Sequence, residues 1–84
     1  MKLETRNMEH LELLHKTIKK NHSVSAETDQ GFQVRISISK DAPEFLDSWM
    51  AADEMFDVRS GSSQMMLSEF EHVTVSDKII SLTN

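Results

Sequence analysis

Apolar residues recur at helical spacing in the first quarter of the chain. Leu11, Leu14 and Ile18 fall within one sector of about 60° on an ideal helical wheel. Acidic residues lie early and lysines late in this stretch, an order that suits the helix dipole. The pattern predicts an amphipathic helix over residues 3–21, with Leu13 pointing away from its apolar face.

A strict alternation follows a polar stretch. Residues 21–31 have the composition of a loop. Residues 32–39 then alternate, with apolar positions at Phe32, Val34, Ile36 and Ile38. One face of this strand should be buried and the other wet, which favours an antiparallel or mixed sheet with one covered face.

The next segment has the features of a second helix. Asp41 and Glu44 are spaced as in a capping box, with Pro43 in the first turn. We expect this helix to run to about Val58 and to stop near Gly61. A helical wheel then predicts an aromatic core face made of Phe45, Trp49, Ala52 and Phe56.

The C-terminal third is harder to interpret. Its alternation slips between Phe70 and Val73, which favours strands with a bulge and a hairpin from about 72 to 82. The alternative is a short helix over residues 63–71 that leads into one terminal strand. With strands preferred, the predicted fold class is α+β. A single domain, residues 1–84, has the order α-β-α-β-β, with one or two amphipathic helices packed on a three-stranded antiparallel or mixed sheet.

Length and composition narrow the biological setting. A chain of 84 residues supports one domain with a modest core, and the absence of cysteine excludes disulfides and favours a reducing compartment. No apolar run approaches the roughly 20 residues of a membrane span. The N-terminus lacks the apolar core of a signal peptide. We therefore expect a cytoplasmic protein with no membrane attachment, or one in the host cytoplasm if a phage encodes it.

Charge is distributed unevenly along the chain. The net charge is −5, yet residues 1–40 hold seven basic and five acidic residues, whereas residues 41–84 hold two basic and nine acidic residues. Such asymmetry bears on solubility and on the choice of partner, not on fold. The excess of acidic residues in residues 41–84 argues against binding of a phosphate backbone by this half of the chain.

Motifs for catalysis, metals and cofactors are absent. His10 and His15 lie about 140° apart on a helix, so they cannot share a metal, and no cysteine completes a zinc set. With Gly31 and Gly61 as the two glycines, neither a Walker loop nor GxGxxG can be written. So short a chain has little room for the desolvated pocket that acid catalysis needs. We predict that the protein is not an enzyme and binds no metal or cofactor.

One face of the predicted second helix carries the candidate partner-binding residues. Carboxylates gather on the side opposite the aromatic face, with a methionine among them and no lysine. This set is Glu44, Asp47, Met50, Glu54 and Asp57. A face selected for solubility alone usually carries both positive and negative charges, as the first predicted helix does. Two interpretations stay open, a solvated surface and an anionic docking surface for Arg and Lys of a partner.

The leading hypothesis is a non-enzymatic protein-binding module. Small size and one-signed charge are typical of an acidic inhibitor or regulator of a larger protein with a basic surface, such as a nucleic-acid-handling protein. Phages and mobile elements encode proteins of this kind. A row of carboxylates on a helix also suggests mimicry of DNA, as a special case of this docking.

Two alternatives belong to other classes. A homodimer or larger assembly would bury the leftover apolar residues Leu13, Met50, Met65 and Leu67. Nucleic-acid binding through Lys16, Lys19 and Lys20 is the third hypothesis, which acidic neighbours and the lack of base-stacking aromatics on the strand argue against.

Overall fold

Strands dominate the secondary structure of the protein. The computed structural model describes residues 1–76. The strands are β1 (Lys2–Glu4), β2 (Ser23–Thr28), β3 (Gln33–Ile38), β4 (Phe56–Ser60), β5 (Ser63–Met65) and β6 (His72–Val75). The helical elements are α1 (Met8–Asn21), the single turn α2 (Ala52–Met55), and two 3-10 turns, η1 (Trp49–Ala51) and η2 (Leu67–Glu69).

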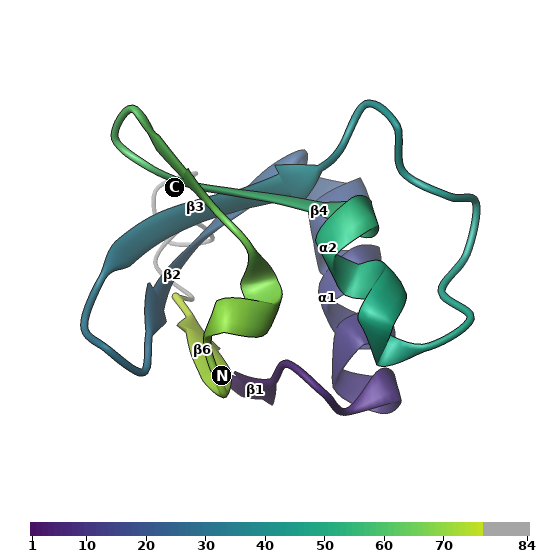
Figure 1. The fold of residues 1–84 in the computed structure, drawn as a ribbon, viewed down its shortest axis with the longest axis horizontal. Helices are drawn as coiled ribbons and strands as arrows, with labels where there is room; N and C mark the ends of the chain where they lie inside the picture. Colours follow the sequence, from purple (N-terminus) through teal and green to yellow (C-terminus); the bar gives the residue numbers. More distant parts are fainter. Residues whose placement is uncertain (77–84) are drawn as a thin grey trace.

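All six strands join one antiparallel sheet in the order β1-β6-β2-β3-β4-β5 (Figure 1). Strands β2 to β5 form a meander, and β6 returns to lie between β1 and β2. The prediction of a three-stranded sheet was therefore wrong. It missed β1, β2 and β4, because each lies in a stretch that the sequence pattern had assigned to a helix or a loop.

The first helix is confirmed with a later start. Its N-cap is Asn7, whose Oδ1 accepts a hydrogen bond from the backbone N–H of His10 at 3.2 Å. Leu11, Leu14 and Ile18 are buried as predicted, and Leu13 is exposed. Helix α1 packs against β1, β2 and β3 and covers one face of the sheet. The predicted start at residue 3 was wrong, because Lys2–Glu4 pairs with β6 instead.

The predicted loop over residues 21–31 contains strand β2. Its buried positions, Val24, Ala26 and Thr28, alternate with polar ones, but alanine and threonine give a weak hydrophobic signal. The predicted strand after it is confirmed as β3. Phe32 precedes the strand, at the end of the β2–β3 turn, and is largely exposed instead of buried.

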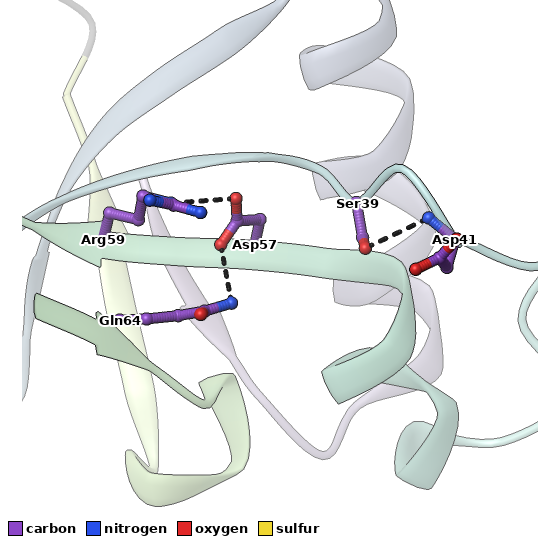
Figure 2. Close-up of polar contacts among 5 residues, drawn as sticks. All are labelled: Ser39, Asp41, Asp57, Arg59 and Gln64. Carbon is purple, nitrogen blue, oxygen red and sulfur yellow. Dashed lines mark hydrogen bonds and ion pairs between the residues drawn. The ribbon is translucent and has the colours of Figure 1, made fainter.

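The predicted helix over residues 41–58 does not form. Residues 39–48 are irregular, and the Asp41 N–H donates to the Ser39 hydroxyl instead of opening a helix (Figure 2). Helical structure begins at Trp49 and ends at Met55, and the chain is extended from Phe56 onward.

Strand β4 forms because its apolar residues complete the sheet. Phe56 pairs with Ile38 and Val58 with Ile36, and both Phe56 and Val58 are buried. The alternation in residues 56–60 was a strand signal that the helical interpretation hid. Gly61 does not stop a helix. It lies in the two-residue β4–β5 turn with φ of +61°, a backbone conformation that hairpin turns require and glycine adopts readily.

The C-terminal region combines both interpretations drawn from the sequence. Residues 63–71 contain a short strand, β5, followed by the turn η2. The Glu69 carboxylate closes that turn by accepting the Met66 N–H at 2.7 Å. Strand β6 occupies the first part of the predicted 72–82 hairpin, and the rest of that hairpin lies outside the described residues.

The core is one continuous cluster that draws on both ends of the described chain. It contains Leu3, Leu11, Leu14, Ile18, Val24, Ala26, Val34, Ile36, Ala52, Met55, Phe56, Val58, Leu67, Val73 and Val75. Thr5 is also buried, and its hydroxyl donates to the Phe70 carbonyl at 2.5 Å. Helix α1, the α2 turn and the η2 turn all contribute to this cluster.

Two methionines in one short stretch test this core directly. Met55 is completely buried, whereas Met50 is 70% exposed. Replacing Met55 with alanine should lower the free energy of unfolding by about 2–5 kcal/mol, since it leaves a cavity. Met50→Ala should change it by less than about 0.5 kcal/mol. Urea denaturation measures both, and equal losses would contradict the placement of the two side chains.

His15 should make stability depend on pH. Its ring packs edge-on against Phe56, with ring centroids 6.4 Å apart. Burial and, to a smaller extent, the charge of Lys19 lower the pKa of His15 from its ordinary value of 6.5. As the pH falls below 6.5, the unfolded chain therefore takes up this proton before the folded chain does. The stability that neutral His15 contributes is complete above that pH and is lost as the pH falls through the folded pKa.

Denaturation at about pH 7.5 and about pH 5.5 should show a larger loss of stability in the wild type than in His15→Gln. Only the change in the free energy of unfolding between the two pH values is compared. A loss of stability that the substitution causes equally at both pH values therefore does not affect the result. Parallel pH dependence in the two proteins would show that His15 has no such role.

Candidate partner-binding surface

The connection between β3 and β4 presents large apolar side chains to solvent. Phe45 is 67% exposed and Met50 is 70% exposed, and Trp49 between them is 37% exposed. The connection swings outward on the right of Figure 1 before it enters η1 and α2. Scattered exposed apolar residues are ordinary, but three within six positions of one connection make it a candidate contact surface. We call residues 44–54 the exposed segment.

The ring of Trp49 contacts a positively charged side chain. The Arg6 guanidinium lies over its ring, 5.2 Å from the centroid. Arg6 belongs to the turn between β1 and α1, so the contact joins two parts of the chain that are distant in sequence. Such contacts contribute about 0.5–1 kcal/mol at exposed sites. The stack orients the indole and still leaves part of it open to solvent.

The η1 and α2 turns divide into an inner and an outer side. Ala52 and Met55 are buried in the core, whereas Met50 and Glu54 are exposed. Met50 and Glu54 are four residues apart in continuous helical structure, so they lie near each other on the outer side.

Asp53 anchors these turns to the rest of the fold. Its Oδ1 accepts the backbone N–H of Ser68 at 2.9 Å, and its Oδ2 accepts the Ser68 hydroxyl at 2.6 Å. Ser68 lies in η2, so one carboxylate joins α2 to η2. Asp53 therefore has a structural role that its sequence neighbour Glu54 does not share.

Four of the five residues predicted to bind a partner lie on the exposed segment. Glu44 and Asp47 are in its irregular part, Met50 is in η1 and Glu54 is in α2, and all four are exposed. They are not one face of a long helix, as the sequence suggested, because that helix is absent. The structure nevertheless keeps them on the same connection.

Asp57 is separated from the other four. It lies in β4, where its carboxylate accepts hydrogen bonds from Arg59 Nε at 3.0 Å and Gln64 Nε2 at 3.2 Å (Figure 2). This carboxylate has an arginine partner on its own strand. The strand pairing moved Asp57 from the predicted acidic face to the sheet.

The aromatic part of this surface was not predicted from the sequence. Phe45 and Trp49 were predicted to be core residues together with Ala52 and Phe56, and of these only Ala52 and Phe56 are buried. Their shared helical face was inferred from a helix that does not form. Pro43 and the polar residues around it were the available sign that the connection starts irregularly.

The exposed segment has a charge of one sign. It contains Glu44, Asp47, Asp53 and Glu54 and no lysine, arginine or histidine. Arg6 supplies a positive charge from outside the segment, at Trp49. Exposed apolar side chains interspersed with carboxylates favour contact with an apolar patch that is bordered by basic residues.

Other kinds of site are not seen in residues 1–76. This part of the chain has no group of three or more histidine and acidic residues placed to hold a metal, and it forms no pocket. None of its helices combines the length and apolar character required to cross a lipid bilayer. Of the surface proposed for a homo-oligomer, Leu13 and Met50 are exposed, Met65 is partly buried and Leu67 is fully buried.

Comparisons with protein families, curated proteins and solved structures give no match for this chain. The function is therefore inferred from the geometry of the surface.

Adjacent acids of the exposed segment should behave differently when they are replaced. Asp53→Ala removes the acceptor of two hydrogen bonds to Ser68 and should lower the free energy of unfolding by about 1–2 kcal/mol. Glu54→Ala should change it by less than about 0.5 kcal/mol. Chemical denaturation distinguishes the two, and a neutral Asp53→Ala variant would show that the link to η2 contributes nothing.

Proposed function

We propose that this protein is a non-enzymatic protein-binding module that docks through the exposed segment. The observation that carries the proposal is the exposure of Phe45 and Met50, which flank the partly exposed Trp49. Glu44, Asp47 and Glu54 surround these side chains without a basic residue in the segment. The partner is a protein with an apolar patch bordered by arginine or lysine.

Physical considerations support docking over simple solvation. Burying apolar surface stabilises a complex by about 25 cal/mol per Å², before the entropy of association is counted. Tryptophan is enriched among the residues that dominate interfaces, and methionine adapts to irregular partner surfaces. The carboxylates add steering toward a basic partner and exclude acidic ones.

An inhibitor or regulator of a larger protein fits these features best. The segment connects two paired strands of the sheet and presents apolar and carboxylate side chains, so its effect on a partner is to occupy a surface. Mimicry of DNA, in contrast, depended on a regular row of carboxylates along a helix. The irregular backbone of residues 39–48 removes that regularity, and we do not retain this special case.

The proposal is tested by comparing what the wild type and its variants retain from a lysate of the source cells. A triple reversal, Glu44→Lys, Asp47→Lys and Glu54→Lys, should abolish retention of the partner. The double variant Phe45→Ser and Met50→Ser removes apolar contact area. It should lower the affinity for the partner by about tenfold or more, because the hot-spot contacts are lost. Affinity is then measured by calorimetry with the purified partner.

A matched control reverses three exposed acids elsewhere, Glu12→Lys, Glu27→Lys and Glu71→Lys. This control changes the net charge equally and should keep the partner. Circular dichroism verifies that all variants are folded. A protein that is retained equally by both reversal variants, or none retained specifically by the wild type, contradicts the proposal.

A further inference from the structure

The face of the sheet opposite α1 carries ordered rows of polar side chains. Register across four strands aligns Ser25, Arg35, Arg59 and Gln64 from β2 to β5. The neighbouring row aligns Ser23, Ser37 and Asp57. The apolar residues that alternate with them point to the core, so these rows face away from it.

Two arginines lie directly opposite each other on this face. Arg35 of β3 pairs with Arg59 of β4, which places their Cβ atoms about 4.5–5.5 Å apart. Like charges in this position destabilise a sheet. The pair is therefore a cost to folding, in a protein with nine basic residues and a net charge of −5.

Neighbouring side chains hold both guanidinium groups in place. Arg35 Nη1 donates to the Ser23 hydroxyl at 2.8 Å, and Arg59 Nε donates to Asp57 Oδ2 at 3.0 Å. Ser23 and Asp57 flank Ser37 in the adjacent row, so the two guanidinium groups reach toward the same row from either side of Ser37.

Each arginine has donors that residues 1–76 leave unused. A guanidinium carries five N–H groups, and the contacts above use one N–H of each arginine. The remaining groups have no acceptor among residues 1–76. They are anchored and exposed, on two residues that pair directly across β3 and β4. A guanidinium held in this way can bind a planar oxyanion with paired hydrogen bonds.

We propose that Arg35 and Arg59 form a binding site for a carboxylate of an acidic protein segment. Asp57 offsets one of the two positive charges, so Arg35, Arg59 and Asp57 together have a net charge of +1, which matches a single carboxylate. Glu27 lies farther along β2 on the same face. Ser25, Ser37 and Gln64 supply small polar neighbours around it. The site is separate from the exposed segment, has the opposite charge and does not depend on the function proposed above.

A nucleic acid fits this face less well. Its rows contain no aromatic side chain on which a base can stack. No pocket among the described residues encloses a free small anion. A carboxylate carried by a protein segment brings additional contacts of its own, which an isolated anion lacks.

Nuclear magnetic resonance tests the site residue by residue. A blocked tetraglutamate peptide is titrated at low ionic strength into the ¹⁵N-labelled protein, and the Nε–H resonances of Arg35 and Arg59 are followed. Both should shift with peptide, and a matched tetraglutamine peptide should leave them unchanged. Replacing either arginine by glutamine should weaken peptide binding by about three- to tenfold, as expected for one charge-assisted contact.

Lys16→Gln is the matched control, because it removes the same charge from α1, on the opposite side of the sheet. It should change the affinity for the peptide less than twofold.

Arg35→Gln should also leave the melting temperature unchanged or higher, since it relieves the like-charge pair. Unshifted arginine resonances, or equal weakening by Lys16→Gln, would overturn the proposal. Tighter, arginine-dependent binding of a thymidine tetranucleotide would overturn the choice of carboxylate.

Discussion

The pairing of β4 with β3 is the constraint on which the rest of this structure depends. Val58 lies beside Ile36 and Phe56 beside Ile38, and this pairing brings the buried side chains of β4 into the core. Since β4 must begin at Phe56, the preceding chain has to leave the sheet after Ile38 and return to it. The N–H of Ser39 donates to the carbonyl of Met55 at 2.8 Å and closes this excursion at its base.

The same connection is tied down at two further points. Asp53 bonds to Ser68 in η2, and the Arg6 guanidinium lies over Trp49. Phe45 and Met50 are thus presented from a connection whose base and helical turns are fixed. A surface held in this way loses less conformational entropy on binding than a free loop, which favours its use as a contact.

The two proposed surfaces differ in charge and in construction. The exposed segment combines carboxylates with large apolar side chains, whereas the sheet face combines two arginines with serines. Asp57 illustrates how strand pairing decides to which of the two surfaces a residue belongs. The predicted helix grouped it with Glu44, Asp47 and Glu54, but its strand places it beside Arg59, where it helps to orient the guanidinium (Figure 2).

The sequence alone determined those elements whose pattern is strong and local. Leu11, Leu14 and Ile18 have helical spacing, and Val34 and Ile36 alternate with polar residues, so α1 and β3 were predictable. Glu44, Asp47, Met50 and Glu54 were also correctly expected to be exposed. These features need only the periodicity of one segment.

Tertiary structure decided the rest. Residues 45–58 suit a helical wheel, yet residues 56–58 also alternate, and the edge of β3 selected the extended state by offering hydrogen bonds and a buried face. Likewise, β1 and β2 carry weak local signals and form because β6 lies between them. The exposure of Phe45 and Trp49 follows from this choice. Strand pairing joins residues far apart in the sequence, so no local pattern contains the information that sets it.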